Sequence, residues 1–255
     1  MNNCFLVRYP RPKITIIYTL VLNNEHYWNL AKRFVNSVAA NPPGYPCGWL
    51  IGCNRGVASP EQIALFSKLG QVDMFVRDNS GWDIGTYIDG ARIAKTESVV
   101  CFGAHAYVQK PGWLMRLVEA WEKFGPGLYG TLASYEIMPH IQTTGFLCPK
   151  ELLTEYPWVV ASKEDRYDFE HSNRALWVIS HQAGYPTMLV TWDGEYPPKE
   201  WRNPPNIYRR GHQGNCVTFF VHSDNYAAFD EHTKRVVESQ ADHLNDPSWP
   251  WLIRQ

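Results

Sequence analysis

The residues best equipped for chemistry in this sequence gather first in the stretch RDNSGWDIGTY, Arg77–Tyr87. An apolar run, VDMFV, leads into it and a helix-like pattern follows at once, which predicts a strand-to-helix turn. Free N–H groups at the start of a helix favour an anion by about 0.3–1 kcal/mol. Arg77 could meet a phosphate there, and the carboxylates of Asp78 and Asp83 could accept hydrogen bonds from hydroxyl groups. An ordinary capped turn is the alternative interpretation.

A second chemically suggestive stretch, NIYRRGHQGN, is basic and rich in glycine. Arg209 and Arg210 could bind phosphate in it, while a simple exposed loop is the alternative. Other catalytic patterns are missing from the sequence: it has no Walker loop, no H-E-x-x-H and no G-x-S-x-G. Its six cysteines show neither a C-x-x-C pair nor zinc-finger spacing, so we expect reduced and mostly buried thiols.

The segments that must position these residues alternate between strand and helix over the first 135 residues. Apolar and β-branched runs predict strands in KITIIYTLVLN, CGWLIGCN, QVDMFV, SVVCFG and LYGTLASY. Helical patterns lie between them, with Asn24 and Ser59 as predicted N-caps and Gln62 as a capping-box partner. This alternation is typical of a right-handed, largely parallel α/β sheet flanked by helices.

Three polar clusters fall at predicted strand ends: Leu22–Asn24, Arg77–Asp83 and Gly103–His105. In an open α/β sheet, ligands bind beyond the carboxyl ends of the strands, at the point where the strand order reverses. The three clusters together therefore predict one ligand crevice.

The second half of the chain is less regular. EDRYDFEHSNRALWVISHQAGY predicts one helix, PTMLVTW and CVTFFVH predict strands, and a final amphipathic helix would carry Phe229 through Leu244. Because no clean boundary separates the two halves, we expect a single domain over residues 1–255.

Composition excludes several classes of protein. Hydrophobic residues make up 45% and charged residues 19%, which is typical of a folded protein and not of a disordered one. A formal net charge of −1 gives no general attraction to nucleic acid or to anionic membranes. The longest apolar run, ITIIYTLVL, is too short to span a bilayer, and the first residues do not resemble a secretory signal. We therefore expect a cytoplasmic protein.

Three segments resemble a known family. DNSGWDIGTYIDGARIA followed by ESVVCFG resembles the N-x-G-x-D-x-G segment and the next strand of bacterial GT-A glycosyltransferases, in the rhamnan synthesis protein F-like group. GLYGTLASYEIMPHIQTTGFLCPKELL resembles that group's G-x-x-G strand, its H-[LIV]-Q-[ST] element and the apolar strand that follows. YDFEHSNRALWVISHQAGY is similar to the group's acidic helix with its G-[YF] ending, and the three segments span roughly residues 14 to 190.

The resemblance implies a Rossmann-like GT-A domain that moves a sugar from a nucleotide-sugar donor to a hydroxyl of a glycan or other acceptor. A nucleotide-sugar-binding half would cover about 14–135, and an acceptor and catalytic half about 136–255. Asp168 or Glu170 would be the general base, with His140 as the next candidate. The residues implied or expected at the donor are Arg77, Asn79, Gly81, Asp83, His105, Gln142, Arg209 and Arg210.

One departure from the family pattern concerns metal. GT-A enzymes usually carry Asp-x-Asp after the fourth strand to hold a divalent cation on the diphosphate, whereas this chain has Gly103-Ala104-His105. Either no metal is used, or Mn²⁺ or Mg²⁺ occupies a weaker site made by His105 with His212 or His222. Cationic side chains such as Arg209, Arg210 or Lys110 could instead neutralise the leaving group.

Two other functions stay open at this point. The missing Asp-x-Asp favours a non-catalytic relative that binds a nucleotide or a sugar. A phage-type enzyme that glycosylates hydroxylated DNA bases is the other, although the net charge of −1 argues against it.

Overall fold

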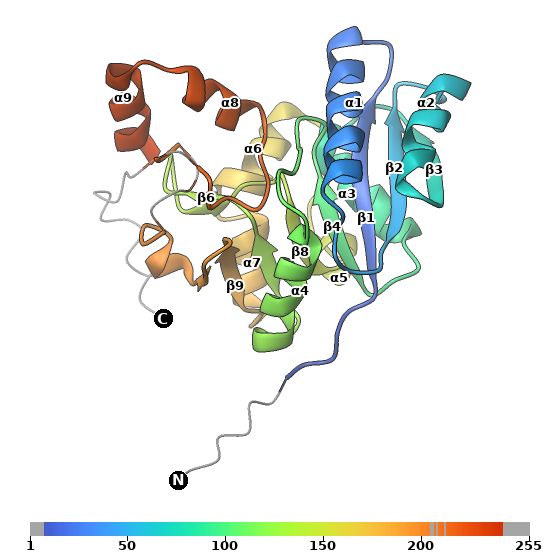
Figure 1. Cartoon of the computed structure of the whole chain (residues 1–255). Helices are drawn as coiled ribbons and strands as arrows, with labels where there is room; N and C mark the ends of the chain where they lie inside the picture. The colour runs from blue at the N-terminus through green and yellow to red at the C-terminus, as the bar shows by residue number, and fades with distance from the viewer. Residues whose placement is uncertain (1–7, 205–206, 208, 212, 242–255) are drawn as a thin grey trace.

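The computed structural model describes residues 8–204, 207, 209–211 and 213–241. Its strands are β1 (Ile14–Val21), β2 (Gly48–Asn54), β3 (Val72–Arg77), β4 (Ser98–Phe102), β5 (Leu128–Gly130), β6 (Ala133–Ser134), β7 (His140–Ile141), β8 (Phe146–Pro149), β9 (Thr187–Val190) and β10 (Glu195–Tyr196). Eight of them form one sheet in the order β10-β9-β5-β8-β4-β1-β2-β3, and β6 pairs with β7 apart from it (Figure 1).

Most strands of the large sheet run in one direction. β1 pairs in parallel with β2 and β4, β2 with β3, and β5 with β9, while β8 and β10 run against the other six. The prediction of a mostly parallel α/β sheet is therefore confirmed. From β1 the chain builds outward through β2 and β3 on one side and through β4 on the other. The strand order thus reverses between β1 and β4, which is where a ligand crevice is expected.

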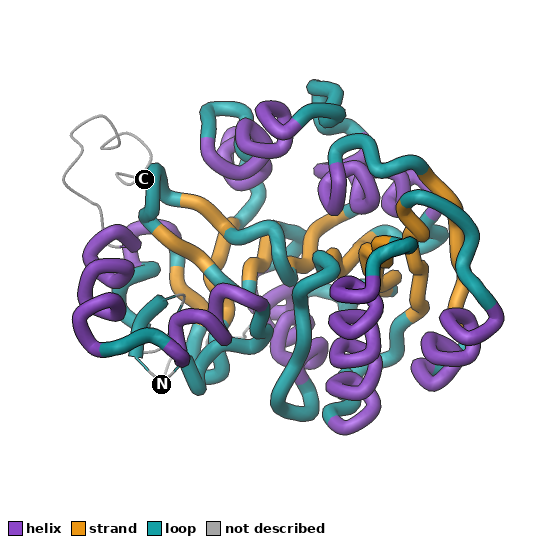
Figure 2. Tube along the Cα trace, turned by 90° about the horizontal axis from the view of Figure 1, so that it is seen from above, coloured by secondary structure: helices purple, strands orange, loops and turns teal. Residues whose placement is uncertain are grey.

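Helices cover both faces of this sheet, as the view from above shows (Figure 2). The α-helices are α1 (Glu25–Ala40), α2 (Pro60–Phe66), α3 (Trp82–Ile93), α4 (Trp113–Phe124), α5 (Glu151–Thr154), α6 (Lys163–His171), α7 (Leu176–Gln182), α8 (Val221–Ala228) and α9 (Glu231–Ala241), with short 3₁₀ turns η1 (Ser67–Leu69) and η2 (Pro198–Glu200).

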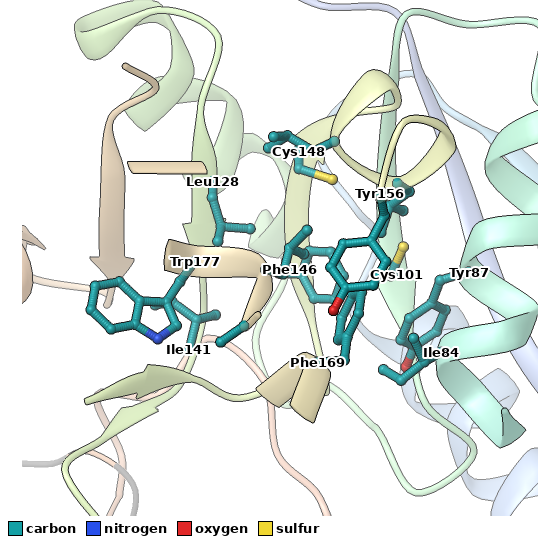
Figure 3. Packing of buried hydrophobic residues seen from close by; sticks show 14 of the residues in the cluster. Ile84, Tyr87, Cys101, Leu128, Ile141, Phe146, Cys148, Tyr156, Phe169 and Trp177 are labelled. Carbon is teal, nitrogen blue, oxygen red and sulfur yellow. The ribbon is translucent and has the colours of Figure 1, made fainter. Parts of the chain in front are cut away.

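Two apolar cores hold the layers together. Helices α1, α2 and α4 pack on one face of the sheet, where Phe34 stacks on Tyr18 with ring centroids 4.1 Å apart. On the other face, α3, α5, α6 and α7 bury a second core that includes Phe146, Phe169 and Trp177 (Figure 3). Burial of aromatic side chains on both faces fixes the sheet rigidly beneath the strand ends.

Local sequence signals start the first helices where they were predicted. The side chain of Asn24 accepts a hydrogen bond from the Tyr27 N–H at 3.3 Å and caps α1. At α2, Ser59 and Gln62 form the predicted capping box, with bonds of 2.8 and 3.3 Å. These contacts are local in sequence, which is why the sequence alone reveals them.

Two predicted elements of the second half are divided in the structure. LYGTLASY gives β5 and β6, because the chain leaves the large sheet after Gly130 to pair with β7. The single helix predicted around residues 164–185 is α6 and α7, separated where Ser172 adopts an extended backbone. Serine and asparagine favour such breaks, because their side chains bond to nearby backbone groups in place of the helix.

The predicted strand CVTFFVH is wrong. Within the described residues, the strand pairing of this segment is limited to isolated antiparallel bridges, Cys216 to Thr191 and Phe219 to Tyr107, and α8 begins at Val221. The segment is apolar because Cys216, Phe219 and Phe220 pack with Leu132 in a small core of their own. Burial alone does not distinguish a strand from a buried loop.

The predicted final helix appears as α9, which begins at Glu231 and is described to Ala241, while Leu244 lies outside the described residues. Helix α8, which precedes it, was not predicted. Backbone bonds between Tyr107 and Phe219, 2.8 and 2.9 Å long, bring α8 to the end of the sheet where the carboxyl end of β1 lies (Figure 1). The tail of the chain therefore reaches the expected crevice.

Candidate functional site

A cavity of about 160 Å³ lies at the carboxyl ends of β1, β2 and β4. It opens at the point where the strand order reverses, and the loop after β3 forms part of its wall. The cavity lies where the crevice was predicted and is lined by residues of two of the three predicted clusters, Arg77–Asp83 and Gly103–His105, but by none of Leu22–Asn24. Its lining includes Thr19, Val21, Tyr27, Asn54, Arg55, Asn79, Trp82, Asp83, Ala104, His105 and Arg166.

The loop Arg77–Gly81 owes its shape to Arg77. The guanidinium is only 8% exposed and donates to the carbonyls of Ser80 at 2.6 Å and Trp82 at 3.3 Å, besides pairing with Asp89 at 3.0 Å. Gly81 has φ +65°, and a Cβ there would lie 2.3 Å from the Val160 carbonyl oxygen, so only glycine fits. The charge of Arg77 thus faces the loop backbone, and the polar residues of this stretch build a rigid turn.

Asn79 lines the cavity, and a hydrogen bond from Asn54 holds its side chain in place. The buried Asn54 donates to the Asn79 Oδ1 at 3.0 Å, and the Thr86 hydroxyl donates to the Asn54 Oδ1 at 3.1 Å. This chain of bonds fixes the orientation of both amides. The free donor group of Asn79 can then face a ligand in a defined direction.

Asp83 and Arg166 form an ion pair within the site. The Arg166 Nε lies 3.0 Å from the Asp83 Oδ1, and the two side chains are 41% and 15% exposed. Burial raises the pKa of Asp83, although the Arg166 charge opposes this, and the Asp83 carboxylate raises the pKa of Arg166. Arg166 is therefore a fixed cation at the cavity wall.

Gly103 lies directly beside this carboxylate. A Cβ at this position would come within 3.4 Å of the Asp83 Oδ2 and 3.2 Å of the Tyr87 hydroxyl. An aspartate here would place a second negative charge against Asp83, which is unfavourable for two buried carboxylates. The missing Asp-x-Asp therefore has a local physical reason.

A larger cavity of about 510 Å³ adjoins the first, and Asp83, His105 and Arg166 line both. Its further walls come from the β6–β7 turn, the end of α6 and the start of α8. The remaining lining residues are Gly103, Glu136, Ile137, Gln142, Thr143, Thr144, Glu170, His171, Phe220, Val221 and His222.

Of the two predicted carboxylates on α6, Glu170 lines this cavity. Its Oε1 accepts bonds from the Thr143 N–H at 3.1 Å and the Thr143 hydroxyl at 3.2 Å. Burial favours the protonated acid, but these bonds and the neighbouring His171 outweigh it and lower the pKa of Glu170 to about 2. Asp168, two residues earlier, projects from another side of the helix and lies 3.3 Å from Arg174.

His140 is fully buried behind Gln142. Its Nδ1 lies 2.8 Å from the Met138 carbonyl oxygen and its Nε2 lies 2.9 Å from the Gln142 side-chain nitrogen. Since a carbonyl only accepts, Nδ1 carries the proton and Nε2 accepts from Gln142. Burial, reinforced by His171, lowers the pKa of His140 to about 4, so the imidazole is neutral at pH 7.

His105 and His222 approach the second cavity from β4 and α8. Burial lowers the pKa of both, so they are neutral. The Nδ1 of His105 is buried and makes no hydrogen bond to the described part of the chain.

The two arginines of the predicted basic loop, Arg209 and Arg210, are both bonded to other parts of the chain. Arg209 pairs with Glu136 at 2.7 and 2.8 Å, beside the cavity that Glu136 lines, and Arg210 donates to the Arg202 carbonyl at 2.6 Å. The structure therefore brings Arg209 close to the second cavity and directs Arg210 toward the chain behind it. Tyr208 and His212 lie outside the described residues.

Solved structures of other proteins share this architecture. No family model and no curated protein matches the sequence. The crystal structure of GalNAc-T7 with UDP, GalNAc and Mn²⁺ is similar at a TM-score of 0.51 and 15% identity, over 70% of this chain and 42% of that one. S. aureus TarS is similar at a TM-score of 0.45 and 13% identity, over 60% of this chain and 32% of that one. The structure of TarS 1–349 is similar at a TM-score of 0.44 and 13% identity, over 60% of this chain and 53% of that one.

The chain has a GT-A-type glycosyltransferase fold. The likeness to GalNAc-T7, together with the strand order around β1 and β4, carries this assignment. The chain spans 32–53% of the length of these proteins. Membership of the rhamnan synthesis protein F-like group stays a prediction. Within the described residues, no helix combines the length and apolar character needed to cross a bilayer.

Sequence reasoning missed several residues of the candidate site. Asn54 and Arg166 were not singled out, although Asn54 ends a predicted strand and Arg166 lies on the predicted acidic helix. The position of Asn54 at a strand end was a usable signal. Thr143 gave none, because its contact with Glu170 joins residues 27 positions apart.

The buried His140 predicts how stability depends on pH. The folded state resists protonation until about pH 4, whereas an unfolded histidine takes up a proton near its ordinary pKa of 6.5. Stability should therefore fall as the pH drops from 6.5 to 4, by up to about 3 kcal/mol from this group. Glu170, with a pKa lowered to about 2, loses its own contribution only below about pH 4.5.

Urea unfolding measured from pH 7 to pH 4.5 checks this prediction. The free energy of unfolding of the His140→Gln variant should change less with pH than that of wild type. The difference corresponds to at most one proton fewer taken up on unfolding. The exposed His232→Gln variant serves as the control and should keep the wild-type slope. Equal slopes in all three proteins would show that His140 is not held neutral.

Proposed function

We propose that this protein is a glycosyltransferase that moves a sugar from a nucleotide-sugar donor to an acceptor hydroxyl. The observation that carries the proposal is the pair of adjoining cavities at the GT-A-type switch point, joined through Asp83, His105 and Arg166. A donor can then lie across them, with its nucleotide in the smaller cavity and its sugar in the larger. The GalNAc-T7 structure, which holds UDP, GalNAc and Mn²⁺, supports a nucleotide and a sugar as ligands of such a fold.

In the smaller cavity, Asn79 and Asp83 are the proposed contacts to the nucleotide. Asn79 is oriented by Asn54, and Asp83 offers carboxylate oxygens to ribose hydroxyls. Gly81 gives the loop the tight turn that lets these side chains reach the ligand. We assign Arg77 the task of holding this loop, since its guanidinium is already bonded to the loop carbonyls.

In the larger cavity, Glu170 is the proposed general base. Glycosyl transfer breaks the bond between the sugar's anomeric carbon and the diphosphate, and forms a bond from that carbon to the acceptor oxygen. The acceptor's proton must leave as that bond forms, and an ionised carboxylate in the cavity can take it. Thr143 fixes one oxygen of Glu170 and leaves the other directed toward His171. Gln142 is a proposed contact to the sugar, and His140 orients it from behind.

Arg166 is the proposed cation for the departing diphosphate. It lines both cavities, so it lies between the nucleotide and the sugar, where negative charge develops as the bond breaks. Its planar guanidinium suits phosphate oxygens. Arg209 is a second cation near the larger cavity, where it is paired with the lining residue Glu136.

The divalent cation usual for this fold fits the residues poorly. Mg²⁺ prefers oxygen ligands, whereas the end of β4 offers Gly103 without a side chain and the neutral imidazole of His105. Among the described residues lining the shared part of the cavities, the nearest carboxylate, Asp83, is already paired with Arg166. His222 adds a second neutral imidazole, a ligand that suits softer ions. This set of ligand atoms does not fit Mg²⁺.

The absent side chain at Gly103 favours a second candidate function, a relative that binds the donor without transferring its sugar. Detectable transfer or hydrolysis of a bound nucleotide sugar separates the two functions. A phage-type enzyme acting on hydroxylated DNA bases and a cytoplasmic location both stay predictions. A DNA mobility shift that weakens with salt would test the former.

Donor binding is the first test of the proposed function. A nucleotide sugar that binds the folded protein at 100 times its Kd should add about 2.7 kcal/mol of stability, seen as a raised melting temperature. Asp83→Asn removes the carboxylate from the cavity and should abolish most of that rise. We expect this result in a thermal-shift screen against nucleotide sugars, with and without Mn²⁺.

Asp73→Asn is the matched control, because Asp73 lines a separate cavity together with Thr15 and Gly48, at the amino ends of β1 and β2. It should leave the ligand-induced rise unchanged. Donor binding that is equally strong in Asp83→Asn would show that the cavity assignment is wrong.

A further inference from the structure

Three side chains with metal-binding atoms converge at the side of the larger cavity formed by the end of α6. The imidazoles of His140 and His171 and the carboxylate of Glu170 place one ligand atom each within 4.8 Å of one another. Two of them are adjacent on α6 and the third comes from β7, so the two elements bring them together. His171 and Glu170 also line the larger cavity, which leaves an open side to solvent.

One distance within this cluster is close to that between two ligands of a coordinated ion. The Nε2 of His171 lies 3.4 Å from the Oε2 of Glu170. Two ligands of a tetrahedral Zn²⁺ at about 2.0–2.1 Å from the metal lie about 3.3 Å apart. The ligand atom of His140 lies within 4.8 Å of these two atoms.

Two of the three ligands, His140 and Glu170, have the outer hydrogen-bond partner that metal sites use. His140 donates its Nδ1 proton to the Met138 carbonyl, so its Nε2, which now accepts from the Gln142 amide, is the nitrogen available to a metal. Thr143 holds the Oε1 of Glu170 by two bonds, so that Oε2 is the oxygen facing His171. The Nδ1 of His171 is buried and makes no hydrogen bond to the described residues, an unsatisfied group within the cluster.

We propose that His140, Glu170 and His171 form a binding site for a zinc-class divalent transition metal, with one coordination position open toward the larger cavity. Two imidazoles and one carboxylate suit Zn²⁺ better than Mg²⁺. The site differs from the one that His105 and His222 could form, since it uses neither of them. Gln142 competes with the metal, because its amide donates to the Nε2 of His140 at 2.9 Å.

The site has a consequence for turnover that rests on the proposed function. A metal bound to Glu170 occupies the carboxylate proposed to take the acceptor's proton. Zn²⁺ should therefore inhibit transfer, and a chelator should relieve the inhibition. Zn²⁺ binding can be measured without the transfer reaction. Failure of the metal site can therefore be distinguished from failure of the proposed function.

The decisive experiment is a Zn²⁺ titration of tag-free full-length protein, first stripped with EDTA, against a chromophoric zinc chelator. Wild type should bind one Zn²⁺ per chain. His171→Asn should weaken binding by at least about 100-fold, because outer partners alone change metal affinity by about 10–100-fold. Gln142→Ala frees the His140 lone pair and should strengthen binding. The double variant His105→Asn with His222→Asn is the control and should bind as wild type does.

The outcomes separate the alternatives. No stoichiometric Zn²⁺ binding in wild type would overturn the proposal. So would loss of binding in the His105 and His222 double variant with full binding retained in His171→Asn. If His171→Asn fails to fold, the test is the stronger Zn²⁺ binding expected in Gln142→Ala. Unchanged or weaker Zn²⁺ binding in that variant would overturn the proposal. Zn²⁺ binding without inhibition of transfer would leave the site standing and remove Glu170 from the role of base.

Discussion

Replacing Glu170 by glutamine is expected to lower the rate of sugar transfer by about 10²–10⁴-fold, with little change in donor affinity. Glutamine keeps an oxygen that can accept both hydrogen bonds from Thr143, so the turn between β7 and β8 should hold its shape. What is lost is the negative charge that receives the proton. Steady-state kinetics and donor binding by calorimetry, measured on the same preparation, check the expectation.

Asp168→Asn is the control for this change. Asp168 lies on the same helix but is paired with Arg174 outside the cavities, so its loss should change turnover by less than about tenfold. A large effect at Asp168 with none at Glu170 would reverse the assignment. Unchanged turnover in both variants would leave the base among other residues of the cavity.

Replacing Arg166 by methionine is expected to lower turnover by about 10²–10³-fold, the usual effect of losing one group that stabilises developing charge. The methionine fills similar space but offers no charge to the diphosphate. Because Asp83 would lose its partner, circular dichroism and the melting temperature must accompany the kinetics. Arg166→Lys keeps the charge and should recover part of the rate. Arg174→Met, on the neighbouring ion pair, should change it little.

The same assays test the role of metal. If Arg166 and Arg209 supply the positive charge, activity should survive EDTA at least in part, and Arg209→Ala with Arg210→Ala should lower it further. Arg210 contributes less, since it is bonded to the Arg202 carbonyl behind the cavity. Complete loss of activity in EDTA with full rescue by Mn²⁺, and no effect of the arginine changes, would contradict this account.

The tertiary structure changed the meaning of the stretch that is most prominent in the sequence. RDNSGWDIGTY predicts a polar cradle, and Asn79 and Asp83 do face a cavity. Arg77, the residue expected to meet phosphate, instead folds inward to partners within or beside the loop, among them Asp89 and the carbonyls of Ser80 and Trp82. Whether a charged side chain points outward or back to its own loop depends on carbonyls that only the folded turn places near it.

The choice between the two carboxylates of α6 was likewise a matter of packing. Asp168 and Glu170 are equal in the sequence as candidate bases. Residues two apart project from a helix in different directions, so only one can face the cavity. The helix is rotated so that Phe169 enters the core, which sends Glu170 to Thr143 and Asp168 to Arg174.

By itself the sequence determined the alternation of strands and helices, the helix caps at Asn24 and Ser59, and the end of the sheet at which the cavity of the candidate site lies. These follow from interactions between neighbours in the chain and from the rule that parallel strands end on one side. Only the tertiary structure decided the antiparallel β8, the ion pair of Asp83 with Arg166, and the convergence of His140 with Glu170 and His171. Each of these joins residues far apart in the chain, and their pairing depends on how the layers pack, which no local pattern records.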